Sequence, residues 1–392
     1  MDKAEIRQEA ASAAASAVEY RRHLHKYPEL SFKEEATGQY VAGILEANGI
    51  GFRKIAGTGI LAKIEGRGDL KNAVVLRADM DALPVHEATG LEFASCNEGV
   101  MHACGHDMHT AALLAALTVI NRHKKQIEGT IFGLFQPGEE INPGGASLVL
   151  KEKPFDGYTV RAVIGEHVDP DLPTGVFGFR EGKYMASSDE VRITVSGEGG
   201  HAAMPHRLKD PVVAAAAIVT SLQQVVSRNA NPDIPTVLSI GRIIADGSTN
   251  VIPDSVFMAG TFRTFDEEWR AQAKKHIRRI AESTASAYGV DASVNISKGF
   301  PSVVNNTELT RKVSELISAT FGNDAVVKLA LRPTAEDFGF YTQLYPSLFY
   351  RFGVGGKPGS RNAGRLHTAQ FDPDENALEY AITGLLTIAF GI

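Results

Sequence analysis

The chain has 392 residues, 44% of them hydrophobic and 22% charged, which is typical of a globular protein of two or three domains. A net charge of −6 excludes the basic excess of most nucleic-acid binders. No apolar run reaches the roughly 18 residues of a membrane span, and acidic residues stand where a signal peptide would be basic. Two cysteines, Cys96 and Cys104, are too few for a disulfide framework. We therefore expect a reduced, cytoplasmic protein with no nucleic-acid or membrane partner.

The first half of the chain alternates helices with short apolar runs. Residues 1–45 are expected to be helical, with an interruption at Pro28. Apolar runs typical of buried strands follow, and the last two flank an apolar helix. The expected strands are 59–66, 72–80 and 129–137, and the helix is 109–126. Strands that alternate with helices predict an α/β fold with a mixed, largely parallel sheet.

The pattern changes near residue 186. A half-exposed strand is followed by a helix, two strands, a charged amphipathic helix and a last strand. Their ranges are 187–197, 210–227, 236–244, 255–265, 266–289 and 291–297. This β-α-β-β-α-β order predicts a ferredoxin-like unit. It is expected at 186–298, inserted into a discontinuous larger domain formed by 1–185 and 299–392. The α/β pattern returns in helix 307–320, strand 347–355 and helix 376–390.

Histidines cluster between a strand-like segment and a helix. His102, His106 and His109 lie within eight residues, together with Cys104 and Asp107. In open α/β sheets, ligand sites form at the carboxyl ends of strands. Thiolate, imidazole and carboxylate are the ligand types of a divalent metal site. The alternative is a capped helix start with scattered surface histidines.

Two adjacent carboxylates, Glu139 and Glu140, follow the apolar strand that ends near Gln136. One carboxylate can bind a metal while its neighbour takes a proton from a metal-activated water. A polar surface loop is the alternative, because pairs of glutamates are common on surfaces. Alone, this motif is weak.

Two isolated histidines complete the pattern. His167 follows a short apolar run, and His367 follows a glycine-rich loop. Either one alone is more often structural than a metal ligand. With Cys104, His106 and Glu140 they make five candidate ligands at loop positions beside strands. Five are too many for one tetrahedral catalytic site and suit two metals that share a ligand. The count predicts a binuclear hydrolase.

Nine segments of the sequence resemble the two-metal peptidase family that holds the aminoacylases and glutamate carboxypeptidases. The most similar branch is that of the amidohydrolases: hippurate hydrolases, auxin-amino-acid conjugate hydrolases and N-acetyl-diaminopimelate deacetylases. The resemblance covers nearly the whole chain, and the segments occur in matching order. They are 21–37, 76–85, 101–111, 136–140, 165–175, 197–206, 250–254, 336–341 and 366–372.

The resemblance implies a role for each candidate ligand. Cys104 takes the place of the aspartate that bridges the two metals in the wider family. By analogy, one metal would be held by Cys104, Glu140 and His367. The other would be held by Cys104, His106 and His167. Zn²⁺ suits cysteine and histidine and Mn²⁺ suits the carboxylate, while Co²⁺ and Ni²⁺ stay open.

Further residues match the chemistry and its support. Glu139 matches the general base and acid of the family. Asp79 and Asp81 lie where the wider family has its first His-x-Asp ligand motif. The histidine of that motif is absent here, so both aspartates are candidates for positioning the ligands from behind. A turn at the end of a strand explains them equally well.

The inserted unit contributes its own candidates. His201 and Asn250 resemble residues that this family brings from a lid domain to stabilise the oxyanion of the tetrahedral intermediate. In dimeric relatives this histidine comes from the partner subunit, which implies a homodimer through the lid. Arg263 is a candidate for binding the substrate's carboxylate, with a surface ion pair as the alternative. His206 lies in the same motif but has no assigned role.

The sequence therefore favours a metal-dependent hydrolase that cleaves the amide bond of N-acyl amino acids. A carboxypeptidase or dipeptidase with the same two-metal site is the main alternative. A cysteine hydrolase with Cys104 as nucleophile would not need Glu139, Glu140, His167 and His367. A degenerate, non-catalytic member is disfavoured because every candidate ligand and the general base are present. The acyl group and the amino acid stay open.

Overall fold

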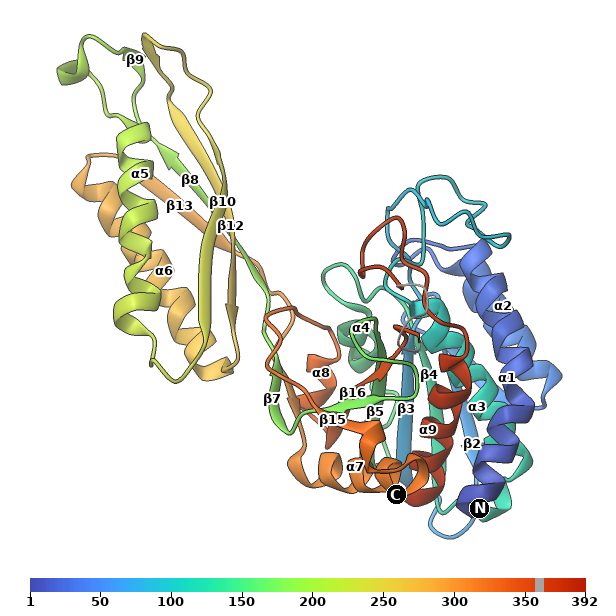
Figure 1. Cartoon of the computed structure of the whole chain (residues 1–392). Helices are drawn as coiled ribbons and strands as arrows, with labels where there is room; N and C mark the ends of the chain where they lie inside the picture. The colour runs from blue at the N-terminus through green and yellow to red at the C-terminus, as the bar shows by residue number, and fades with distance from the viewer. Residues whose placement is uncertain (357–362) are drawn as a thin grey trace. The chain divides into compact units, whose positions relative to one another are not determined.

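A mixed eight-stranded sheet forms the centre of the larger of two units (Figure 1). The computed structural model describes residues 1–356 and 363–392. The larger unit comprises Met1–Tyr184, Val304–Ala330 and Asp337–Ile392, and the smaller one Met185–Val303 and Leu331–Glu336. The sequence placed 299–303 and Leu331–Glu336 in the larger domain, but both belong to the smaller unit. The Ser188 amide donates to the Phe300 carbonyl oxygen, and the Ala186 amide donates to the carbonyl oxygens of Arg332 and Thr334.

The strands of the large sheet follow the order β1-β2-β4-β3-β5-β16-β6-β15. Strand β3 pairs in parallel with β4 and β5, β5 with β16, and β6 with β15. The bounds are β1 Gly51–Ile55, β2 Gly59–Glu65, β3 Asn72–Asp79, β4 Thr130–Gln136, β5 Thr159–Asp169, β6 Phe177–Phe179, β15 Val326–Lys328 and β16 Ser347–Gly353. The expected α/β class with a mixed, largely parallel sheet is confirmed. The carboxyl ends of β3, β4 and β5 meet at one edge.

Five helices and one face of this sheet share a single hydrophobic core. These helices are α1 Lys3–Lys26, α2 Glu35–Ala47, α3 His106–Arg122, α7 Thr307–Phe321 and α9 Ala377–Gly391. Helix α3 is buried along nearly its whole length, and α1 and α9 pack against it. Alternate residues of β3, including Val74 and Leu76, enter this core. The apolar period of each segment thus sets the face that it buries.

Shorter elements complete the larger unit. Helices α4 Gly145–Lys151 and α8 Gly339–Thr342 contact each other, and they contact β4 and β16 respectively. Strands β7 Gly182–Met185 and β14 Val303–Asn305 pair where the chain passes between the units. Single-turn helices lie at η1 Lys124–Gln126 and η4 Asn323–Ala325. Among the helices of the two described ranges, none has the length and apolarity of a membrane span.

The smaller unit is built on an antiparallel sheet of order β10-β12-β8-β13 (Figure 1). Its elements follow the chain order β8, α5, β10, β12, α6, β13, with bounds Asp189–Ser196, Pro211–Leu222, Thr236–Ile244, Ser255–Thr264, Glu267–Ala287 and Asp291–Ile296. The sheet and both helices share a second hydrophobic core. Shorter elements are β9 Gly200–His201, η2 Pro205–Arg207, η3 Val225–Asn229 and β11 Val251–Ile252. This is the expected ferredoxin-like order.

Candidate metal centre

Polar side chains gather where three neighbouring strands of the larger unit end. Asp79 is the last residue of β3, and the loop that carries Glu139 and Glu140 leaves the end of β4. His167 lies inside β5, two residues before the strand ends at Asp169. The sequence had placed His167 in a loop, and this is corrected. Helix α3 begins at this edge with His106, after Gly105 in a left-handed conformation.

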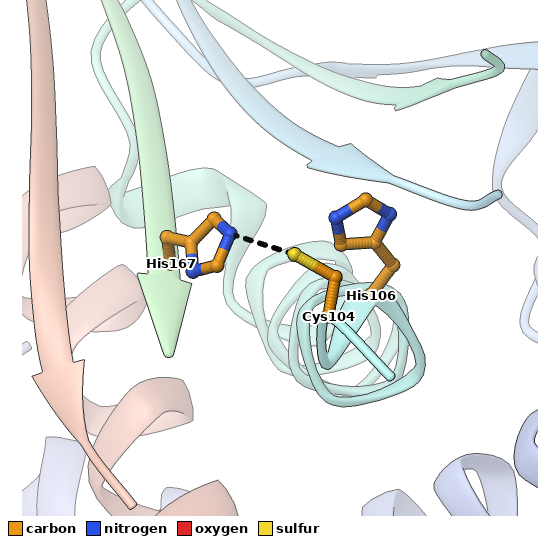
Figure 2. Close-up of side chains that lie close together, drawn as sticks. All are labelled: Cys104, His106 and His167. Carbon is orange, nitrogen blue, oxygen red and sulfur yellow. Dashed lines mark hydrogen bonds between the residues drawn. The ribbon is translucent and has the colours of Figure 1, made fainter. Parts of the chain in front are cut away.

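Cys104 lies at the centre of two groups of potential ligands. One group is Cys104, His106 and His167, and the other is Cys104, Glu140 and His367. In each, the ligand atoms all lie within 4.8 Å of one another. The Cys104 Sγ atom is 3.5 Å from Nε2 of His167 and 3.3 Å from Nε2 of His367. Figure 2 shows the His106 and His167 rings on either side of Cys104. The residues are those expected as ligands, and they share one thiol.

The two buried histidines of the first group have one ring nitrogen committed to the protein. Nδ1 of His167 lies 2.8 Å from the Val168 carbonyl oxygen, and Nδ1 of His106 lies 2.9 Å from that of Asp81. A carbonyl only accepts, so each Nδ1 donates a proton there, and Nε2 is the ring nitrogen left facing the ligand group. Nε2 is then the atom available to a cation, as a protein partner on the other nitrogen typically arranges.

Two buried atoms at this site lack a hydrogen-bond partner in the part of the chain that the structure describes. They are Nε2 of His106 and Oε1 of Glu140, which lie 3.9 Å apart; Oε1 also lies 3.4 Å from Nε2 of His367. An unpaired buried polar atom costs free energy, so such atoms call for a partner. A divalent cation would satisfy both lone pairs at once. The donor set of thiol, imidazole and carboxylate therefore fits metal ions.

The thiol of Cys104 has the properties of a metal ligand rather than of a free nucleophile. Burial, and then the charge of Glu140, raise the pKa of Cys104. A nucleophilic cysteine needs a lowered pKa, whereas a bound cation stabilises the thiolate directly. The side chain is 6% exposed. These features disfavour the cysteine-hydrolase alternative.

Glu139 lies beside the ligand groups. Its carboxylate is buried, accepts a hydrogen bond of 3.3 Å from the Asp337 amide, and forms a possible ligand cluster with His106 and Glu140. A carboxylate there is placed to exchange a proton with a group bound next to it.

Asp81 contacts two of the candidate ligands, the His106 ring and the Glu140 backbone amide. Its Oδ2 atom accepts the Glu140 amide at 2.9 Å and the Ser31 hydroxyl at 2.7 Å, and its Oδ1 lies 3.2 Å from Nδ1 of His106. Burial alone would raise the pKa of Asp81, but its hydrogen bond and ion pair with His106 lower it. This carboxylate therefore holds both His106 and the Glu139–Glu140 loop.

Asp79 contacts a different histidine. Its Oδ1 atom lies 2.6 Å from Nδ1 of His109, while Nε2 of His109 accepts the Val168 amide at 2.9 Å. Both ring nitrogens of His109 are thus used within the protein. Arg77 also forms an ion pair with Asp79 through Nη1 and with Asp337 through Nη2. Like His102, His109 belongs to neither group that contains Cys104.

The remaining predicted residues lie in the smaller unit. His201 in β9 pairs with Val251 in β11, and the Asn250 carbonyl oxygen accepts the Ala202 amide. His201 and Asn250 therefore lie close together at the antiparallel pair of β9 and β11, and both are exposed. Arg263 is half-buried on β12 and donates to the Thr261 hydroxyl. His206 is exposed in η2.

Sequence reasoning missed the residues that support the site from the segment between α1 and α2. Ser31 contacts Asp81, and Glu34 accepts the Gly138 amide at 2.8 Å. Both lie within 21–37, one of the segments that carry the family resemblance. That position was the only signal, because a serine and a glutamate in a polar stretch have no distinctive spacing.

The sequence matches one protein-family model and is similar to curated proteins over most of its length. The family described as Peptidase family M20/M25/M40 matches residues 75–389. An N-acetylcysteine deacetylase from Bacillus subtilis is 40% identical over 366 residues, covering 93% of each chain. A probable hydrolase from Synechocystis is 39% identical over 377 residues, covering 95% of this chain and 94% of the relative.

Two solved structures resemble this chain over nearly its whole length. A dinuclear metal-binding peptidase of the M20 family from Bacillus subtilis superposes with a TM-score of 0.83 at 36% identity, covering 97% of this chain and 98% of the other. A protein from methicillin-resistant Staphylococcus aureus gives a TM-score of 0.91 at 32% identity, covering all of both chains.

Proposed function

Because this chain belongs to Peptidase family M20/M25/M40, a family of hydrolases, we propose that it cleaves the amide bond of N-acyl amino acids. The products are a carboxylate and a free amino acid. The observation that carries the proposal is the pair of ligand groups that share Cys104, with the Glu139 carboxylate beside them. The similarity to an N-acetylcysteine deacetylase favours acetyl as the first acyl group to test.

The site would hold two divalent cations. Cys104 would be shared, with His106 and His167 completing one set of ligands and Glu140 and His367 the other. When bound, such cations supply Lewis acidity to the amide carbonyl and to the attacking water. The similarity to a dinuclear metal-binding peptidase supports this count. Zn²⁺ and Mn²⁺ suit the ligand set best, with Co²⁺ and Ni²⁺ as further candidates.

The protein's own groups divide the remaining work. Glu139 would take the proton from water as the water attacks and later deliver it to the leaving amine. Asp81 orients the His106 ring and fixes the Glu140 amide, which keeps the ligands in place when no substrate is bound. Asp79 contributes less directly, through His109.

The smaller unit would act as a lid and a dimer interface. His201 and Asn250 would donate hydrogen bonds to the oxyanion, with His201 supplied by the partner subunit, and Arg263 would bind the free carboxylate. The adjacent positions of His201 and Asn250 support a joint role. Exposed apolar side chains on the edge strand β10, Val237 and Ile243, support a homodimer through this unit.

Release of the free amine from a mixed panel tests the proposal. The panel contains N-acetyl, N-benzoyl and indoleacetyl amino acids together with simple dipeptides. Metal-stripped protein receives Zn²⁺, Mn²⁺, Co²⁺ or Ni²⁺ in turn, with Glu139→Ala as the blank. Metal-dependent release from N-acyl amino acids that vanishes in the variant is the expected result. Release from dipeptides alone would favour the peptidase alternative, and no release with any metal would contradict the proposal.

A further inference from the structure

The segment between α1 and α2 lies against the strand end that carries the site. The Ala82 amide donates to the Glu29 carbonyl oxygen at 2.8 Å, and Leu30 forms a parallel bridge with Ala82. These backbone contacts dock the segment beside the end of β3. They bring Ser31 within reach of Asp81, just after β3, and Glu34 within reach of the loop that follows β4, about a hundred residues later in the chain.

Glu34 begins α2 but does not cap it. As the residue before the first turn, its side chain makes no capping hydrogen bond. The carboxylate of Glu29 does this instead, and accepts the amides of Ala36 and Thr37 at 3.2 and 2.8 Å. Glu34 is therefore free to turn away from its own helix. Its side chain is fully buried.

The Glu34 carboxylate accepts hydrogen bonds from Gly138 in the loop, and from Phe32 and Thr58. Oε1 accepts the Gly138 amide at 2.8 Å and the Phe32 amide at 2.9 Å. Oε2 accepts the Thr58 hydroxyl at 2.7 Å. Gly138 is the residue directly before Glu139, so one oxygen of Glu34 fixes the peptide plane that leads into the Glu139–Glu140 pair.

The backbone around this contact leaves little room for another arrangement. Gly138 has φ +58°, and a Cβ atom there would lie 2.2 Å from Cε1 of Phe32. Phe32 itself has φ +63°, which is unusual for a bulky residue and is held by the Glu34 hydrogen bond to its amide. On its other side, the Gly138 carbonyl oxygen accepts the Gly145 amide at 2.9 Å.

We propose that Glu34 is a positioning residue for Glu139, acting through the Gly138 amide and the Phe32 ring. This rests on the proposed function, in which Glu139 moves the proton. Glu34 works by its length and its hydrogen-bond acceptors and not by its charge. A displacement of about 1 Å at a reacting group costs on the order of 100-fold in rate. Loss of this contact therefore lowers kcat and leaves KM and metal content nearly unchanged.

Two conservative variants separate length from charge. Glu34→Asp keeps the charge but is one methylene shorter, so it cannot reach the Gly138 amide. Glu34→Gln keeps the length and the Oε1 acceptor, and its amide can donate to the Thr58 hydroxyl. We expect Glu34→Asp to lower kcat roughly 10- to 100-fold and Glu34→Gln to stay within about threefold of wild type. Glu35→Asp, the same change at the neighbouring residue, whose side chain is exposed, is the matched control.

Amide hydrogen exchange of the peptide that contains Gln136–Glu140 provides a readout independent of turnover. We expect faster exchange in Glu34→Asp and wild-type protection in Glu34→Gln and Glu35→Asp. Equal loss of kcat in the Asp and Gln variants, or wild-type kcat and protection in Glu34→Asp, would overturn the proposal. If the wild type releases no amine from any substrate, the proposed function fails. Protection of this loop then still decides whether Glu34 positions it.

Discussion

At the residue scale, hydrogen bonds decide which histidine can serve as a ligand. His106 and His109 are three residues apart at the start of one helix. His106 gives one nitrogen to the protein and leaves Nε2 without a hydrogen bond among the described residues, whereas His109 uses both nitrogens in hydrogen bonds. Sequence spacing alone could not distinguish them, because the partners come from β3 and β5.

Replacing Cys104 tests whether one thiol serves both ligand groups. Because Cys104 belongs to each group, Cys104→Ala should lower the bound metal from two ions per chain to one or fewer. Cys96, the other cysteine, is exposed, so Cys96→Ala is the matched control. Elemental analysis of the dialysed proteins measures the metal content. A Cys104→Ala protein that keeps both ions and the full rate would show that the thiol does not bridge.

At the element scale, most long segments could be predicted and the shortest could not; the eleven-residue β5 is an exception, because the sequence indicated only a short apolar run before His167. Apolar runs marked β2, β3, β4 and β16, and a charged amphipathic pattern marked α6. Strands β6 and β15, of three residues each, and α8, of four, have too few residues to show a period. They are specified by their neighbours in the sheet instead.

The loop that carries Glu139 and Glu140 shows why the motif was recognisable but its support was not. Its residues are consecutive, so sequence shows them together. The contacts that hold it come from Glu34, Asp81 and Gly145, which lie on three separate segments. Only the fold brings these segments to one sheet edge. The candidate ligands were therefore named from sequence, while the residues that position them required the structure.

Gly145 provides a test of this loop's packing. A Cβ atom at Gly145 would lie 1.6 Å from the Pro137 carbonyl oxygen, so Gly145→Ala must push the loop away. We expect a loss of roughly 1–3 kcal/mol in stability, together with a lower kcat. At Gly43 inside α2 a Cβ atom meets nothing within 4 Å, so Gly43→Ala should gain about 0.5–1 kcal/mol. Urea unfolding measures both, and a neutral Gly145→Ala would contradict the close packing.

At the scale of the whole molecule, the chain forms two units with separate hydrophobic cores. The protein has a single tryptophan, Trp269, which is buried in α6 of the smaller unit. Its indole N–H donates to the Thr236 hydroxyl at 3.0 Å. Tryptophan fluorescence therefore reports on the smaller unit alone, which allows its stability to be followed separately.

A buried ion pair in the smaller unit predicts how its stability depends on pH. Burial alone would raise the pKa of Asp189, but hydrogen bonds from Arg270 and Lys274 lower it below its usual value. A lowered pKa contributes stability above the unfolded value, about 4, and that stability is lost as pH falls through the folded pKa. Wild type should therefore lose stability below about pH 4.

Asp189→Asn separates this effect from general acid denaturation. At pH 6 the variant should be destabilised by about 3–5 kcal/mol, because Arg270 and Lys274 lose a buried partner. Its stability should then change less than that of wild type between pH 6 and pH 3. Urea unfolding monitored by Trp269 fluorescence measures both proteins. Parallel pH dependences would show that Asp189 is not the group responsible.

The proposed homodimer is testable on the edge strand β10. Ile243 is 54% exposed there, so a charge at this position costs little in the isolated chain but much in a packed interface. We expect Ile243→Arg to convert a dimer into a monomer in sedimentation velocity. Val304→Arg is the control, because Val304 is exposed on β14 in the larger unit, and it should leave the dimer intact. A monomeric wild type would contradict the dimer.

Amine release measured against added metal tests the two-metal hydrolase most directly. Metal-stripped wild type and Glu139→Ala are each titrated with Zn²⁺ or Mn²⁺ while binding and release are followed together. We predict that wild-type activity rises until two equivalents are bound. Glu139→Ala should also bind two equivalents but turn over at least about 100-fold more slowly. Full activity at one equivalent, or a Glu139→Ala protein as fast as wild type, would contradict the account.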